Sequence, residues 1–153
     1  MMSESPPPAR PDAVDRGLAA TFLGFAATSF LFDRAAALDW VGPDVGDPFG
    51  RALWWYGVNF DPLVAANPLH LQVTSALSAF AFGPFYLLLA WCLVRRRAWI
   101  RTPAIVYASV MLYSMVVHLV VEFYCETPPT NLAVFVGACA AYVGSSRVAA
   151  AHA

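Results

Sequence analysis

Four long apolar stretches dominate this chain, and each is long enough to cross a lipid bilayer. A membrane-spanning helix needs about 20 mostly apolar residues, and such stretches occupy residues 17–38, 69–94, 100–124 and 131–150. Only 12% of the residues are charged and the mean hydropathy is +0.59, whereas a soluble domain carries roughly 25% charged residues. The sequence therefore predicts an all-α membrane protein built as a bundle of four transmembrane helices.

The segments outside these stretches suggest the domain organisation. Residues 1–16 are polar and rich in proline, which predicts a disordered cytosolic tail. Residues 17–150 would then form one membrane domain. Residues 39–68 combine Asp, Pro and Gly with aromatic residues, so they fit either an aromatic belt at the membrane surface or an ordered cap over one mouth of the bundle. We include them in the predicted fold as an ordered outer loop between the first two helices.

The second apolar stretch carries Gly83 and Pro84 near its middle. Proline lacks a backbone N–H and its ring clashes with the preceding turn, so a kink is predicted there and Pro84 is assigned a structural role. Inside a membrane, the carbonyl that Pro84 frees must find a partner in a neighbouring helix or in water.

The arginines indicate the orientation of the bundle. With an even number of helices, most of them fall on the side of the two termini, and only Arg34 and Arg51 fall on the other side. Cytosolic loops carry the excess of basic residues, so both termini are predicted to be cytosolic. All basic residues are Arg and the chain is rich in Ala, which is typical of a GC-rich genome. We therefore expect a multi-pass protein of a bacterial cell membrane.

Several partners and cofactors are not expected. The net charge of −1 offers no basic patch for nucleic acid. The three cysteines, Cys92, Cys125 and Cys139, have no CxxC spacing, so neither a redox motif nor a metal site is predicted. A haem would need paired axial ligands, and His118 stands alone in its apolar stretch. No cofactor is therefore expected.

A few polar side chains interrupt the apolar stretches at similar depths. His118 and Glu122 are four residues apart, so they share one face of a helix. An ionisable group inside a membrane helix costs at least about 2.5–3.5 kcal/mol and usually faces the bundle interior. The level that we expect to form a ligand site holds six residues: Asp33, Thr74, Ser75, Tyr113, His118 and Glu122.

Each ionisable candidate also has a simpler interpretation. Asp33 precedes Arg34 and could be an ion at the membrane surface, and Glu122 could be a solvated residue at the rim. His118 lies deeper and could be a hydrogen-bonded core residue. The shared depth of the three favours a common cavity, in which Glu122 would tune the proton affinity of His118.

Three segments resemble the EXPERA family, which holds the sigma-two receptor and the emopamil-binding protein, a sterol isomerase. They are "FLFDRAAAL" at 30–38, "WWYGVNFDPL" at 54–63 and "WIRTPAIVY" at 99–107. The resemblance implies a membrane bundle with a lipid-accessible cavity for sterols and cationic amphiphiles, often in a homodimer. It places Asp33 on the acidic position of the first helix and Asp61 on the acidic position before the second, where a structural role is expected. The chain would be a short bacterial member.

The chain also departs from the family pattern. Relatives carry a glutamate nine residues before the proline of the second helix, and that position holds Ser75 here. The isomerase has a His-x-x-x-Glu pair on its first helix, where this chain has Phe25 and Ser29. A similar pair, "HLVVE", occurs instead at residues 118–122. The isomerase activity therefore cannot simply be transferred.

Two functions remain in view, with a third as a background possibility. The first is binding of a sterol-like or terpenoid lipid, or of a cationic amphiphile, with Asp33 and Glu122 as counter-ions. The second is a proton-shuttling isomerase or cyclase acting on an isoprenoid or sterol double bond, with His118 and Glu122 as the catalytic pair. The third is a transporter or structural protein, although a transporter would be expected to show inverted repeats, and none is evident.

Overall fold

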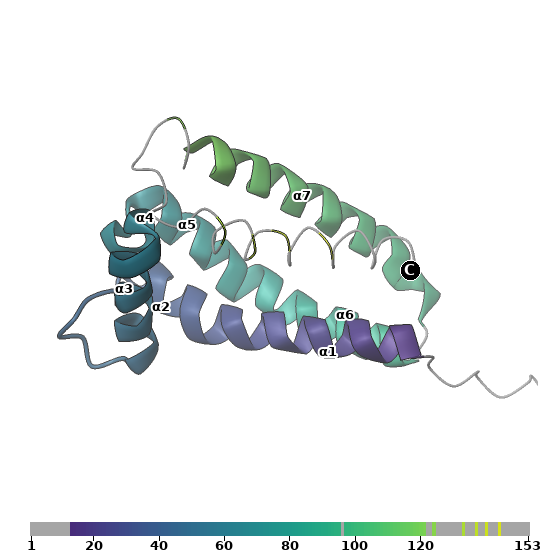
Figure 1. The fold of residues 1–153 in the computed structure, drawn as a ribbon. Helices are drawn as coiled ribbons and strands as arrows, with labels where there is room; N and C mark the ends of the chain where they lie inside the picture. Colours follow the sequence, from purple (N-terminus) through teal and green to yellow (C-terminus); the bar gives the residue numbers. More distant parts are fainter. Residues whose placement is uncertain are drawn as a thin grey trace, which may run out of the picture.

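The structure is a computed structural model that describes residues 13–95 and 97–121 and the single positions 124, 133, 137, 140 and 144. The described residues form helices and contain no strand. Figure 1 shows long helical rods that run roughly along one another and a short helix that stands across one end of them. The fold class is thus all-α, in agreement with the sequence.

The first rod runs without interruption through α1 (Ala13–Thr28), the π-helical segment η1 (Ser29–Asp33) and α2 (Arg34–Ala37). In η1 the backbone pairs residues five apart, because the N–H of Arg34 donates to the carbonyl of Ser29. A π segment inserts one extra residue into a helical turn and is frequently found at functional sites.

The second rod repeats this design with α5 (Leu69–Leu77), η2 (Ser78–Phe82) and α6 (Gly83–Arg95). The N–H of Gly83 donates to the carbonyl of Ser78, again five residues back. The irregular segment ends at Phe82, two residues before Pro84, the residue that predicted a helix distortion. The missing N–H of Pro84 is thus accommodated by wider π pairing.

The two π segments lie against each other where the first and second rods pack. A Cβ atom on Gly83 would lie 3.1 Å from the ring of Phe30, so the absence of a side chain at Gly83 allows this close approach. The register between the rods is therefore set at the point where both are π-helical.

Residues 39–68 are not the loop that the sequence predicted, because most of them form α3 (Pro48–Phe60) and α4 (Pro62–Ala66). Asp47 caps α3 by accepting a 2.8 Å hydrogen bond from the N–H of Gly50, and Pro48 fits the first helical position. Gly57 lets the two helices touch, since a Cβ there would lie 2.3 Å from the backbone nitrogen of Ala65. Figure 1 shows α3 lying across the end of the first rod.

A polar network ties this helical pair to the two rods. Asn67 adopts a left-handed conformation with φ of 41°. Its amide nitrogen donates to the carbonyl of Ala36 and to Asp39, both at 3.0 Å. Gln72 donates to the same carboxylate of Asp39 at 3.2 Å. The end of the first rod and the start of the second are therefore held together by side chains.

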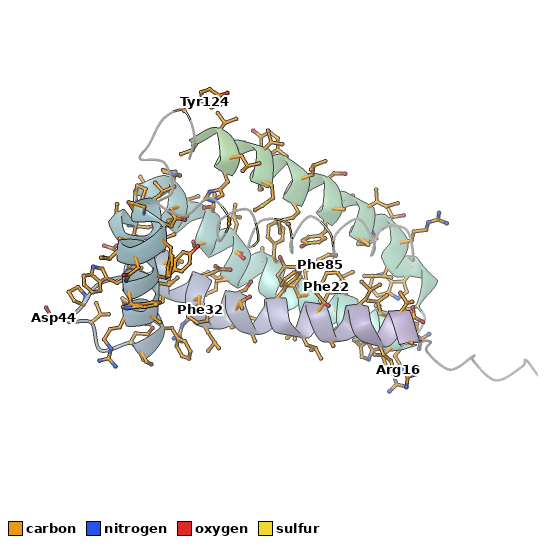
Figure 2. The ribbon with its side chains drawn as sticks, viewed as in Figure 1. Arg16, Phe22, Phe32, Asp44, Phe85 and Tyr124 are labelled. Atoms are coloured by element: carbon orange, nitrogen blue, oxygen red, sulfur yellow. The ribbon has the colours of Figure 1, made fainter. Side chains whose placement is uncertain are left out.

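The third rod begins with a short 3-10 turn, η3 (Ala98–Ile100), and continues as α7 (Arg101–Val120). Its first half joins the core through Ala104, Tyr107 and Met111, which pack with α1 and α6. Figure 2 shows Phe22 and Phe85 together between the rods, where they belong to the same core. The core thus binds three rods at one end of the bundle.

Two helices are long and apolar enough to cross a membrane: Leu69–Arg95, with 27 residues, and Arg101–Val120, with 20. They correspond to the second and third predicted spans. The first predicted span is helical, whereas the fourth lies almost entirely outside the described residues. The number of four membrane helices therefore stays a prediction.

Candidate functional site

Asp33 is held between the first two rods by a chain of hydroxyl groups. The hydroxyl of Ser78 donates to the Oδ2 atom of Asp33 at 2.5 Å. The oxygens of Ser29 and Ser78 lie 3.1 Å apart, and since Ser78 has only one proton to give, Ser29 is the donor in that pair. Two successive hydrogen bonds therefore end on the carboxylate.

The π segments explain why these three residues meet. Ser29 and Asp33 are the first and last residues of η1, and Ser78 is the first residue of η2. Ser29 is fully buried, while Asp33 and Ser78 are partly exposed. The carboxylate is thus held by a hydroxyl of the second rod, and it belongs to a residue that keeps part of its surface exposed.

The neighbouring cation does not neutralise Asp33 in this arrangement. Arg34 pairs instead with Asp47 at 3.3 Å, and its guanidinium lies over the ring of Trp40 at 5.4 Å. Although Asp33 and Arg34 are adjacent in sequence, the side chain of Asp33 bonds to the second rod, whereas that of Arg34 contacts the segment before α3.

Other members of the predicted site lie elsewhere. Ser75 is buried on the second rod, one turn before Ser78. Thr74 is exposed, and its hydroxyl bonds to the carbonyls of His70 and Leu71, both at 3.0 Å. Tyr113 is 71% exposed on α7. Among the described residues, no hydrogen bond joins Thr74 or Tyr113 to Asp33. Glu122 lies outside the described residues.

His118 belongs to a second polar group, at the far end of α7. It is half-buried, and Asp61 and His70 are among the groups whose charges act on it. His70 lies in the first turn of α5, and Asp61 lies at the junction of α3 and α4. The partners that the structure describes for Asp33 are hydroxyls of the first two rods, whereas the groups described around His118 come from α5 and from the junction of α3 and α4. A shared site for the two residues stays a prediction.

Asp61 does not make the capping bond that the sequence predicted. It precedes α4, but its side chain makes no cap hydrogen bond with that helix. Pro62 at the first helical position does not explain this, because Asp47 precedes Pro48 in the same way and still caps α3 through the N–H of Gly50. The side chain is instead turned inward, because Asp61 is only 3% exposed and its Oδ1 atom is buried without a hydrogen-bond partner.

The aromatic residues of the rods mostly form core. Tyr86 stacks on Phe22 with ring centroids 6.0 Å apart, and the hydroxyl of Tyr107 donates to that of Tyr86 at 3.1 Å. Both tyrosines are buried. By contrast, Tyr124 is 85% exposed, and Figure 2 shows it at the periphery beyond α7. The aromatic residues of the described rods thus stabilise packing between helices more than they surround a cation.

Sequence reasoning named Asp33 and His118 as candidates, but it did not identify Ser29 and Ser78 as hydroxyl groups near Asp33. Ser29 precedes Asp33 by four residues, which is a usable signal for a shared helix face. Ser78 gave no comparable signal, because its position opposite Asp33 depends on how the two rods pack. In the described part of the chain, no group of three His, Cys, Asp or Glu residues converges to hold a metal ion.

The model of one protein family, EBP: EXPERA (EXPanded EBP superfamily), matches residues 48–146, more than half of the chain. The chain belongs to the EXPERA superfamily. This superfamily of membrane proteins includes sterol-binding and isomerase-like members. Comparison with curated proteins and with solved structures gave no match.

The EXPERA match covers the two polar groups unequally. It begins at Pro48, the first residue of α3, and includes Asp61, Ser78 and His118. Asp33 and Ser29 precede the matched residues. The family match therefore covers Ser78, on the second rod, but not the two members of the Asp33 group on the first rod.

Proposed function

We propose that this EXPERA protein binds a sterol-like or terpenoid lipid in an intramembrane cavity, and that cationic amphiphiles compete for the same site. The supporting observation is the Asp33 carboxylate, which lies between two apolar helices and accepts a hydrogen bond from a neutral hydroxyl while Arg34 pairs with Asp47. Such a carboxylate can accept a further bond from the hydroxyl of a sterol or from an ammonium group.

The energetics favour a ligand that brings a donor. A charged side chain among membrane helices is costly, and it usually marks a binding or transport site. Hydrogen bonds to a charged group stabilise by about 1.5–3 kcal/mol, roughly twice the value for neutral pairs. Ser78 supplies one such bond to Asp33, and the partly exposed side of the carboxylate is where a ligand would supply another.

The proposal includes a placement in the membrane. Both termini would lie in the cytosol, and α3 and α4 would lie on the opposite side, as the distribution of arginines indicates. Residues 131–150 would supply the fourth membrane helix. A homodimer in a bacterial cell membrane fits the family resemblance.

An isomerase or cyclase is the second candidate, and one observation favours it. His118 is half-buried in an apolar helix, and the charge of Asp61 acts on it from another segment. An imidazole beside a carboxylate can move a proton between two carbons of an alkene, which is what double-bond isomerisation requires.

Lipid extraction from the purified protein tests the binding proposal. Mass spectrometry should detect an isoprenoid or sterol-like lipid with the wild type and less of it with Asp33→Asn. Asp44→Asn is the matched control, because Asp44 is exposed and Figure 2 shows it at the edge of the molecule. Bulk phospholipid alone in every preparation would contradict the proposal.

Isotope exchange separates binding from turnover. The wild type is incubated in deuterated water with an alkene-containing isoprenoid that it binds. An isomerase should transfer deuterium to the product, and His118→Gln should abolish this transfer. A ligand that binds tightly and never acquires deuterium would leave binding as the function.

A further inference from the structure

The hydroxyl groups of Ser29 and Ser78 are used differently from those of other helix residues. Four other hydroxyls in the described helices donate to carbonyls of their own helices, each at 3.0 Å: those of Thr21, Thr28, Thr74 and Ser109. Serine and threonine inside helices commonly return to the backbone in this way. Ser78 instead donates across the rod interface to Asp33, and its oxygen lies 3.1 Å from that of Ser29. The two serines are therefore committed to the carboxylate rather than to their own backbone.

The donor direction in this chain of hydroxyls is fixed. A hydroxyl has one proton to give, and Ser78 gives its proton to the Oδ2 atom of Asp33 at 2.5 Å, a distance typical of a bond to a charged oxygen. The oxygen of Ser78 then accepts from Ser29, which strengthens the bond that Ser78 donates, because successive hydrogen bonds polarise one another. Ser29 is fully buried, so its effect on a ligand has to pass through Ser78 and Asp33.

This arrangement makes the two carboxylate oxygens of Asp33 unequal. Ser78 occupies Oδ2, whereas no hydrogen bond of the described residues ends on Oδ1. Guanidinium and amidinium groups bind a carboxylate best by donating to both oxygens in parallel, so they would have to share Oδ2 with Ser78 or displace it. A sterol hydroxyl or a tertiary ammonium has a single proton to donate, and Oδ1 alone satisfies it.

We propose that Ser78 is a specificity-determining residue that makes Asp33 selective for ligand head groups with a single proton to donate. Ser29 is the positioning residue that holds Ser78 in its donor orientation, and it contacts no ligand. The preferred ligands are an alcohol or a tertiary amine on a sterol-like or terpenoid skeleton, and head groups that grip both oxygens are disfavoured.

This inference rests on the proposed function, because it requires the head group of the ligand to meet Asp33. It is measured as the ratio of two affinities, which a general loss of structure would not move, since both ligands would then weaken alike. A protein that binds neither ligand contradicts the proposed function. A protein that binds both, with a ratio that does not depend on Ser78, contradicts only the selectivity.

Two probes with the same sterol-like skeleton test the selectivity. One carries a dimethylammonium group and the other a guanidinium group at the same carbon, and their Kd values are measured with the full-length protein in lipid nanodiscs at a pH where both groups are protonated. Ser78→Ala should shift the affinity ratio toward the guanidinium probe by about tenfold, the scale of one hydrogen bond to a charged group. Ser78→Thr, which keeps the hydroxyl, should retain the wild-type ratio.

Ser29→Ala should shift the ratio in the same direction as Ser78→Ala but by less, because Ser78 keeps its own proton. Ser109→Ala is the control, since Ser109 is exposed and bonds to its own helix, and it should leave the ratio unchanged. An unchanged ratio in a folded Ser78→Ala protein would overturn the proposal. If Ser78→Ala does not fold, the wild type still decides, because tenfold tighter binding of the guanidinium probe than of the ammonium probe would show that both oxygens of Asp33 are free.

Discussion

Asp33 and Asp61 are two aspartates in apolar surroundings, and the fold gives them opposite environments. Asp33 is partly exposed and accepts a bond from Ser78, which is itself next to Ser29. Asp61 is buried, and its Oδ1 atom has no partner. The carboxylate of Asp33 is stabilised by a hydrogen bond between the first two rods. The carboxylate of Asp61 is held by burial and packing.

This difference separates two kinds of polar site. A carboxylate fixed by hydroxyls and open on one side suits a ligand that arrives from the membrane. A buried carboxylate with an unused acceptor suits a donor from within the protein. The two groups would then have distinct tasks in one protein.

The largest expected effect comes from breaking the segment that holds Asp61. Gly57→Ala would place a Cβ 2.3 Å from the backbone nitrogen of Ala65, which cannot move away as a side chain can. The free energy of unfolding should fall by about 3 kcal/mol, at the upper end of overpacking effects. Equilibrium unfolding in mixed detergent micelles measures this loss.

Gly24→Ala is the matched control. Gly24 lies in α1, and a Cβ there meets nothing within 4 Å. Because alanine favours a helix over glycine by roughly 0.5–1 kcal/mol, this variant should be unchanged or slightly more stable. Equal losses in the two variants would show that α3 and α4 are not packed at Gly57.

A smaller loss is expected when the Asp33 group is broken. Ser78→Ala removes the donor that lies 2.5 Å from Asp33 and leaves that carboxylate with one bond fewer. Bonds to charged groups are worth about 1.5–3 kcal/mol, and unfolding should become easier by an amount in that range. Ser109→Ala is the control, since Ser109 is exposed and bonds only to its own helix, at Ile105. Indistinguishable stabilities of the two variants would mean that Ser78 does not hold Asp33.

The smallest expected effect concerns the network at Asn67. Asn67→Gly permits the same left-handed backbone but loses the bonds to Ala36 and Asp39. The variant also removes a buried amide oxygen that has no partner, which offsets part of the loss. A decrease of about 1 kcal/mol is expected, because the bond to Ala36 is neutral, the bond to the carboxylate of the exposed Asp39 is weakened by solvent, and the lost amide oxygen offsets part of both. Asn67→Ala should lose more, because alanine is strained at a positive φ, and the reverse order would contradict this explanation.

The helical rods could be predicted from hydrophobicity, because apolar runs of this length have few alternatives. The helices of residues 48–66 were missed although their signals are present. Asp47-Pro48 and Asp61-Pro62 each pair a capping residue with a proline at the first helical position. The aromatic and glycine content of the segment concealed these signals, since both are equally typical of a membrane-surface loop.

The π segments and the partners of the two aspartates could not be predicted. One extra residue in a helical turn hardly changes the hydrophobic pattern of a uniformly apolar stretch. Pro84 indicated a distortion in the second rod, and no comparable residue marked η1 in the first. Ser78 meets Asp33 because the ring of Phe30 packs at Gly83, and such a register is a property of the packed helices. Asp61 and His118 are far apart in sequence, so the electrostatic effect of the one on the other depends on how the helices are arranged.

A comparison of two ligands at Asp33 tests the proposed function most directly. The ligands are a cationic amine and a neutral isostere with the same sterol-like skeleton, and their affinities are measured for the wild type, Asp33→Asn and Asp44→Asn. Asp33→Asn should weaken binding of the amine by about 1–3 kcal/mol, the scale of a hydrogen bond to a charged group, and leave the isostere nearly unchanged. Asp44→Asn should affect neither. If Asp33→Asn binds both ligands as the wild type does, Asp33 is not the ligand contact and the proposed function is contradicted.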